Sequence, residues 1–202
     1  MKHHSYMTKL IHSLSPLALV ALLGACGTAE ATTEPAAAPP AITEAQRIER
    51  GQYLVGITGC HDCHSPKIMG PKGPELDPAR LLSGFPADRQ LPPVPANAQG
   101  WALMAMDLTA AVGPWGTSFA ANITSDETGI GNWTEEQFER ALRHGLYKGM
   151  EGSRPLLPPM PWQNLANLKP EDLRDMFAYL KSTKPVENVV PAPIPPVGAM
   201  PR

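Results

Sequence analysis

Apolar positions recur with helical spacing in two stretches of the second half of the chain. In the first of them, Phe138 is followed by Ala141 and Leu142 on the same helical face. The second stretch has the same period, with apolar positions at Leu173, Met176, Phe177 and Leu180. The pattern predicts two amphipathic helices, one ending at Gly145 and the other beginning at Pro170.

Two copies of the capping-box pattern mark the starts of helices. In each copy a threonine precedes a glutamine by three residues, as Thr43 precedes Gln46 and Thr134 precedes Gln137. Each side chain then bonds to the backbone N–H of the other residue at the open start of the helix. The second box begins the helix that contains Phe138. The first box predicts a further helix, from residue 43 to about residue 55.

Gly51 lies inside this first helix, where a glycine is less favourable than an alanine by about 1 kcal/mol. We interpret it as a point of close contact with another helix. The alternative is a helix that frays at this glycine. Gly56 and Gly59 then interrupt the chain just before Cys60.

The segments without a helical period divide the chain into parts. Residues 26–42 are rich in Ala, Thr, Glu and Pro and predict a flexible tether. Residues 188–202 are rich in proline and predict an extended tail. One folded domain over residues 43–187 remains. Its pattern predicts an all-α fold, with four to five short helices joined by long proline-rich loops.

Residues 65–121 predict the least regular structure, because prolines interrupt them repeatedly. A short helix is predicted to begin at Asp77-Pro78, since proline suits the first helical position. Trp101, Met104 and Met106 are expected to be core residues beneath a loop, with a place beside a cofactor as the alternative.

The N-terminal segment predicts export. Lys2 and Lys9 precede an apolar run over residues 14–25 that is too short to span a bilayer comfortably. The run ends in Leu23-Gly24-Ala25-Cys26, which resembles a bacterial lipobox, where the cysteine after the cleavage site receives lipid. We interpret residues 1–25 as a lipoprotein signal peptide and Cys26 as the lipidated residue of a periplasmic, membrane-anchored protein. The alternative is an ordinary secretory signal.

Composition narrows the classes of function. The 202 residues carry a formal net charge of −2, and 43% are hydrophobic, which is ordinary for a soluble domain. Removal of residues 1–25 takes away two lysines and no acid, which leaves −4. This balance argues against nucleic acid as a partner, because such binding needs a basic surface.

Cys60-His61-Asp62-Cys63-His64 is the most specific motif in the chain. Its C-x-x-C-H spacing is that of a c-type haem attachment site. Each thiol can form a thioether to the same haem, and His64 then supplies the proximal imidazole. A zinc site needs four ligands, and the only other cysteine is Cys26. A thioredoxin-like pair would follow a strand rather than a helix, and a plain disulfide would leave His64 without a role.

Met160 is the predicted distal ligand. Prolines flank it on both sides, and their fixed φ makes a stiff loop that loses little entropy on ordering. Stiffness matters because an iron–thioether bond is weak. Among the alternatives, His144 ends a helix, where a charged or capping role is more usual, and Met176 lies on an apolar helical face. Met160 itself has the alternative of packing within a surface loop.

At this point the chain resembles the class I cytochrome c family, in which a first helix leads into C-x-x-C-H, a methionine loop follows and a last helix closes the fold. It is more closely similar to bacterial monohaem cytochromes and to the cytochrome c subunits of periplasmic dehydrogenases. The similarity is carried by WGTSFAANIT at 115–124, TGIGNWT at 128–134 and LPPMPW at 157–162. It implies that Gly51 crosses closely against Tyr179 or Phe177.

The resemblance also implies Cys60 and Cys63 as haem anchors, His64 as proximal ligand and Met160 as distal ligand. The chain has one C-x-x-C-H motif, so one covalent haem c is expected.

Two further residues are candidates for contact with the haem propionates. Trp133 would donate its indole N–H, and Arg143 would neutralise charge. The alternatives are core packing for Trp133 and a solvated helix end for Arg143.

We therefore predict an electron carrier that exchanges single electrons with redox partner proteins, a donor dehydrogenase and an acceptor oxidase or cytochrome. No residue set suggests a substrate pocket, so we expect no catalysis by this domain itself. One alternative is a cytochrome subunit within a quinoprotein or flavoprotein dehydrogenase complex. The other is a five-coordinate haem sensor or enzyme.

Overall fold

The computed structural model describes residues 42–95 and 100–196. The helices in this part are α1 (Glu44–Ile57), α2 (Cys60–His64), α3 (Glu135–His144), the 3₁₀ turn η1 (Tyr147–Gly149), α4 (Trp162–Leu165) and α5 (Pro170–Ser182). The predicted signal peptide over 1–25, Cys26, nearly all of the tether and residues 197–202 lie outside the described residues. Within the described ranges, no helix is both long enough and apolar enough to cross a bilayer.

Short strands between α2 and α3 form two small antiparallel sheets. One is a hairpin of β1 (Lys67–Gly70) and β2 (Gly73–Leu76). The other has the order β3 (Leu103–Met104), β4 (Ala110–Gly113) and β5 (Gly116–Phe119). The predicted helical architecture is confirmed, and these sheets, which the proline-broken pattern did not reveal, are an addition to it.

Local sequence signals account for the ends of the longer helices. α1 and α3 both begin at the predicted capping boxes, with both reciprocal bonds formed. Gly145 follows α3 with a left-handed φ of 61°, a conformation that glycine adopts without steric cost. Pro170 occupies the first turn of α5. The predicted positions of these three helices are therefore confirmed.

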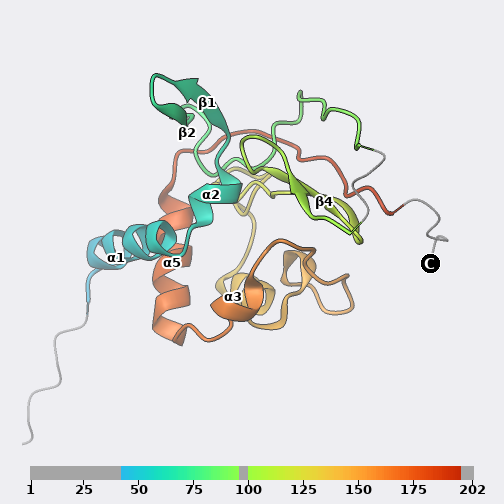
Figure 1. Ribbon diagram of the computed structural model, residues 1–202. Coiled ribbons are helices and arrows are strands. Elements are labelled where there is room, and N and C mark those ends of the chain that lie inside the picture. Colours follow the sequence, from blue (N-terminus) through green and yellow to red (C-terminus); the bar gives the residue numbers. More distant parts are fainter. Residues whose placement is uncertain (1–41, 96–99, 197–202) are drawn as a thin grey trace, which may run out of the picture. The chain divides into compact units, whose positions relative to one another are not determined.

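α1 and α5 cross closely at Gly51 (Figure 1). A Cβ atom at this position would lie 1.9 Å from the carbonyl oxygen of Asp175 and 2.8 Å from the Cβ atom of Tyr179. Any larger side chain would therefore push the two helices apart. The predicted contact between Gly51 and Tyr179 is confirmed, and α1 continues past Gly51 without fraying.

Ion pairs join the same two helices. The carboxylate of Asp175 on α5 is buried, and it accepts hydrogen bonds from Arg47 at 3.2 Å and from Arg50 at 2.8 Å. Arg50 also pairs with Asp172. A buried carboxylate without partners would be strongly destabilising, so the two arginines of α1 allow α5 to carry an acid on its inner face. The sequence patterns did not indicate this network.

The hydrophobic core lies where α1, α3 and α5 meet. The rings of Phe138 and Phe177 pack at 5.4 Å between centroids. Met176 is 1% exposed, which confirms its assignment to the core. The buried members of the core are Leu54, Val55, Leu82, Ile130, Phe138, Leu142, Leu165, Leu173, Met176 and Leu180.

The helix predicted at Asp77-Pro78 is wrong, because residues 78–82 form turns. The carboxylate of Asp77 accepts hydrogen bonds from the Ala79 backbone N–H at 2.9 Å and from the Arg80 guanidinium at 2.8 Å. A short acidic side chain that bonds to an N–H two residues later stabilises a turn in competition with a helix.

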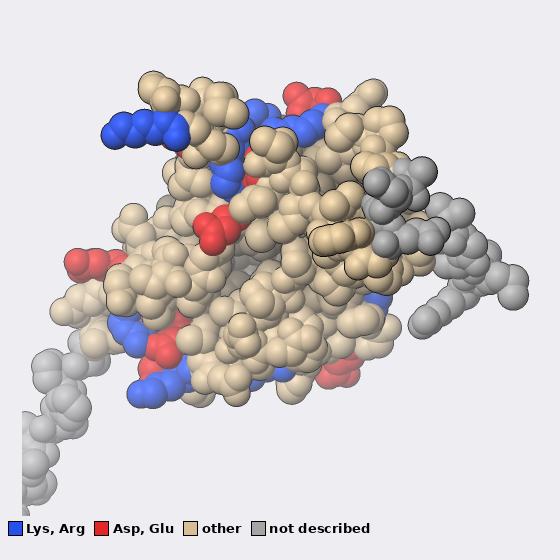
Figure 2. Space-filling model, viewed as in Figure 1, with Lys and Arg blue, Asp and Glu red and all other residues tan. Residues whose placement is uncertain are grey.

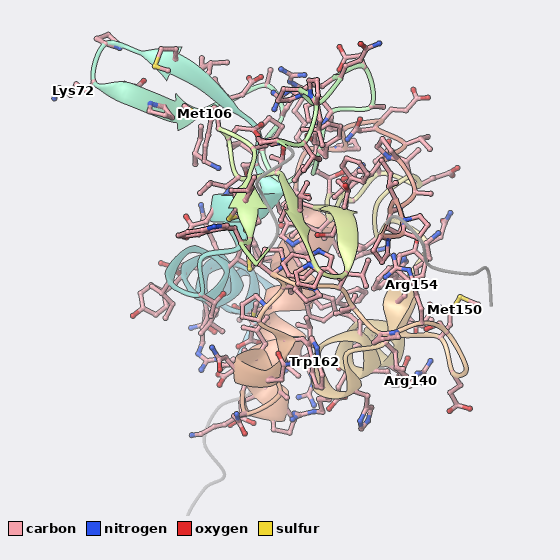
Figure 3. The ribbon with its side chains drawn as sticks, turned by 45° about the vertical axis from the view of Figure 1, so that its right-hand side comes forward. Lys72, Met106, Arg140, Met150, Arg154 and Trp162 are labelled. Atoms are coloured by element: carbon pink, nitrogen blue, oxygen red, sulfur yellow. The ribbon has the colours of Figure 1, made fainter. Side chains whose placement is uncertain are left out.

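The core assignment of Trp101, Met104 and Met106 is also wrong, because their exposed fractions are 68%, 41% and 84%. β3 is the edge strand of its sheet, which leaves these neighbouring positions open to solvent. Figure 3 shows Met106 together with Lys72, which lies at the turn between β1 and β2.

The segment after α5 runs back along the domain. Thr117 of β5 and Ile194 exchange both backbone hydrogen bonds, at 2.7 and 3.0 Å. The side chain of Asn188 donates to the carbonyl oxygens of Ser83 and Phe85. The described part of the tail therefore lies against β5 as an added edge (Figure 1).

Candidate haem-binding site

α2 carries both cysteines and the histidine of the C-x-x-C-H motif. Gly59 begins it with a left-handed φ of 73°. Cys60 and Cys63 are three residues apart, so both thiols lie on one helical face, and neither is in a disulfide. Burial raises the pKa of both thiols above its ordinary value, which keeps them protonated at neutral pH. Two neighbouring thiols on one face can bond to a single flat ligand.

His64, the last residue of α2, is held by a backbone carbonyl. Its Nδ1 lies 2.7 Å from the carbonyl oxygen of Ala121. A carbonyl can only accept, so Nδ1 carries the proton and Nε2 keeps a free lone pair. Burial lowers the pKa of the imidazole, while the bond to Ala121 acts in the opposite direction. The result is a neutral, oriented imidazole, which is the form that binds a metal.

Two residues just after the motif hold α2 in place. The hydroxyl of Ser65 accepts a hydrogen bond from the Leu82 backbone N–H at 2.8 Å. The ammonium group of Lys67 donates to the carbonyl oxygens of Asp62 at 2.6 Å, Ser65 at 3.1 Å and Asp107 at 2.8 Å. A cation among the last carbonyls of a helix stabilises its end. The motif alone gave no indication of either residue.

Met160 lies in the loop between η1 and α4 and is half-buried. It packs against the same core as Cys60 and Trp133. A residue from another element holds this loop: the hydroxyl of Ser118 in β5 donates to the carbonyl oxygen of Pro158 at 2.6 Å. The structure thus brings Met160 and Cys60 to one core.

The other candidates for a distal ligand lie elsewhere. His144 is exposed at the end of α3. Met176 is enclosed within the core, between α5 and its neighbours. Met150 is 53% exposed and projects at the margin of the domain (Figure 3). Met160 therefore remains the candidate that combines partial burial with contact to the core beside Cys60.

Trp133 and Arg143, the two residues predicted to contact the propionates, differ in their hydrogen-bond partners. Trp133 is half-buried against the core, and its indole nitrogen donates to no acceptor among the described residues, so it is available to a ligand. Arg143 instead donates to the Glu139 carboxylate at 2.6 Å and to the Ala166 carbonyl oxygen at 3.0 Å. Both roles stay predictions, and that of Arg143 would require it to exchange these partners.

Figure 2 shows the surface hollowed in the middle of one face, with mostly uncharged atoms around the hollow and an acidic side chain beside it. A separate open pocket of about 340 Å³ lies between α1, α3 and α5. Its lining includes Arg47, Arg174 and Phe177 but no residue of the motif or of the Met160 loop. We therefore do not assign it to the haem site.

The residues present fit a covalently attached haem. Two thiols share one helical face, the imidazole beside them has its Nδ1 proton fixed by Ala121, and a thioether borders the same core. Histidines that ligate a metal through one ring nitrogen typically donate the N–H of the other to a carbonyl or carboxylate, as Nδ1 of His64 does to Ala121. Ala121 contributes only its backbone, so no side-chain pattern could have identified it.

Comparison with known proteins agrees with this geometry. The family model described as Cytochrome c matches residues 48–184. The chain is 43% identical over 141 residues to the cytochrome c subunit of a quinone alcohol dehydrogenase from Gluconobacter oxydans, covering 69% of this chain and 22% of that protein. It is 31% identical over 180 residues to the fructose dehydrogenase cytochrome subunit of Gluconobacter japonicus, covering 88% of this chain and 30% of the relative.

A third relative is the gluconate 2-dehydrogenase cytochrome c subunit of Pantoea cypripedii, 31% identical over 133 residues, which are 65% of this chain and 22% of that protein. The chain thus spans less than a third of the length of each of these relatives. The family match covers most of the described domain, from α1 to the end of α5. Members of this family carry covalently bound haem c. The chain belongs to the cytochrome c family.

Proposed function

We propose that this domain carries single electrons on one haem c, attached at Cys60 and Cys63, with His64 as proximal and Met160 as distal ligand. The observation that supports it best is the bond from His64 Nδ1 to the Ala121 carbonyl, directly beside two free thiols. When bound, the haem supplies a one-electron iron couple.

The residues of the chain set the properties of that couple. The Ala121 carbonyl orients the imidazole of His64 and increases its basicity as a ligand. A methionine opposite a histidine raises the reduction potential. Because Met160 would occupy the sixth position, oxygen and other small ligands are disfavoured. This argues for a carrier over the alternative, a five-coordinate sensor or enzyme.

We further propose that a dehydrogenase supplies the electrons. The similar proteins from Gluconobacter are named as cytochrome subunits of alcohol and fructose dehydrogenases. The mostly uncharged surface around the hollow in Figure 2 suits contact with another protein. In this proposal Cys26 anchors the domain to a bacterial membrane from the periplasmic side. The alternative is a carrier that exchanges electrons with its partners without being a subunit of a dehydrogenase complex.

The test is to export the full chain from a host with c-type haem maturation. We expect the intact mass to rise by one haem, and the haem to remain attached after denaturation and organic extraction. The pyridine haemochrome spectrum should shift in Cys60→Ala and Cys63→Ala, because each retains a single thioether. A chain that carries no covalent haem, or carries two, would refute the proposal.

A further inference from the structure

The loop that carries Met160 is poor in hydrogen-bond donors. Pro158, Pro159 and Pro161 have no backbone N–H, so Met160 supplies the only one between residues 158 and 161. That N–H bonds within the loop, to the Leu157 carbonyl at 3.2 Å. Any backbone hydrogen bond that ties residues 158–161 to the rest of the domain must therefore reach one of their carbonyl oxygens.

Ser118 makes that bond. Its hydroxyl donates to the Pro158 carbonyl over 2.6 Å, across 40 residues of sequence. The carbonyl of Pro161 is used by Asn164, at the start of α4. Among the described residues, the bond from Ser118 is the one hydrogen bond that joins residues 158–160 to another part of the fold.

The Ser118 oxygen has a second partner that holds it in place. Trp115 donates its indole N–H to the Ser118 oxygen at 3.2 Å, and an indole nitrogen can only donate. The hydroxyl has one hydrogen to donate, and the Pro158 carbonyl at 2.6 Å is a much closer acceptor than the Ala111 carbonyl at 3.4 Å. Ser118 is 7% exposed, so water does not compete easily for this bond.

The strand that carries Ser118 is itself held on both edges. β5 pairs with β4 on one side, and Thr117 pairs with Ile194 of the C-terminal segment on the other. Gly116 lies so close to this segment that an added Cβ would be 2.0 Å from the Ile194 carbonyl oxygen. The serine is therefore presented from a fixed backbone.

We propose that Ser118, oriented by Trp115, is the positioning residue that holds the Met160 loop closed and so keeps the methionine sulfur at the iron. The inference rests on the proposed function, in which Met160 is the distal ligand. Loss of the hydroxyl leaves the Pro158 carbonyl without its partner and shifts the loop toward an open form.

The test compares holo-protein with Ser118→Ala, Ser118→Thr and the matched control Ser125→Ala. Ser125 also donates to a distant backbone carbonyl at 2.6 Å, that of Thr183, but it holds the end of α5. In Ser118→Ala we expect carbon monoxide to bind the ferrous protein roughly tenfold faster, the factor for about 1.4 kcal/mol. The long-wavelength band of methionine-ligated ferric haem should also disappear at a lower temperature.

Ser118→Thr retains a hydroxyl, so its carbon monoxide binding rate and the temperature at which the band disappears should be close to those of wild type. Ser125→Ala should leave both quantities unchanged. Should Ser118→Ala not fold, Trp115→Phe removes the orienting N–H and is expected to raise the carbon monoxide rate in the same direction. Wild-type rates in the Ser118→Ala protein, or an equal rise in Ser125→Ala, would overturn the inference. A wild-type protein that lacks the band would instead overturn the assignment of Met160.

Discussion

Asp107 has a buried carboxylate and a backbone carbonyl that is linked through Lys67 to the C-x-x-C-H motif. It is 5% exposed and accepts hydrogen bonds from the Arg89 guanidinium and from the backbone and hydroxyl of Thr109. Burial acts to raise the pKa of this carboxyl, but the bonds from Arg89 and Thr109 outweigh it, and the pKa lies below its ordinary value. The backbone carbonyl of the same residue accepts from Lys67, which holds the end of α2.

This environment predicts a pH dependence of stability. The pKa of this carboxyl is lower in the folded than in the unfolded state. Such a group stabilises the fold at pH values above the pKa of the unfolded chain, which is about 4, and this contribution is lost as the pH falls through the lower, folded-state pKa. Asp107→Asn should therefore lower the free energy of unfolding by about 1–3 kcal/mol at pH 6, with the difference shrinking toward pH 2. Urea unfolding across this range measures it. A difference that is constant with pH, or one also seen in the exposed Asp88→Asn, would contradict the argument.

His64 illustrates what can be predicted at the scale of single residues. The spacing of cysteines and histidine predicts the side chains of the candidate site, because the chemistry of haem attachment dictates their order. Ala121, the partner of His64, and Pro158, the partner of Ser118, both accept through their backbone carbonyls. Every residue has such a carbonyl, so only the fold reveals these two contacts. Ser118 was included in a similarity motif, but its bond to Pro158 depends on two segments 40 residues apart.

At the scale of elements, α1 and α5 cross so closely at residue 51 that only glycine fits there. Gly51→Ala would place a Cβ 1.9 Å from a carbonyl oxygen of α5, so the helices must separate. We expect a loss of about 1–3 kcal/mol in the free energy of unfolding, measured by chemical denaturation of the holo-protein.

Gly56 provides the matched control within the same helix. A Cβ added there meets nothing within 4 Å, so Gly56→Ala should stabilise the protein by about 0.5–1 kcal/mol through helix propensity. If both substitutions changed stability in the same direction and by the same amount, the close crossing would not be the cause.

The helices were predictable because their signals are local. Capping boxes, an amphipathic period and a terminal glycine or proline all lie within the element they define. The strands were not, because each is four residues or fewer and is stabilised by a partner elsewhere in the chain. β5 depends on β4 and on Ile194, and no pattern within residues 116–119 indicates that pairing.

For the whole molecule, the site is assembled from three separate parts of the chain. α2 supplies the thiols and the imidazole, β5 and the residues after it supply Ser118 and the Ala121 carbonyl, and the proline loop supplies Met160. The packing of α1, α3 and α5 forms the common core against which these parts lie. In the proposed function both ligands would be held by such fixed contacts, which favours electron transfer with little rearrangement.

The most direct test of this account is the optical spectrum of the ferric holo-protein in wild type, Met160→Ala and Met150→Ala. Met150 is the matched control, since it is an exposed methionine in the same part of the chain. We predict the long-wavelength band of methionine–iron ligation in wild type and in Met150→Ala, and its absence in Met160→Ala. Retention of the band in Met160→Ala would contradict the account.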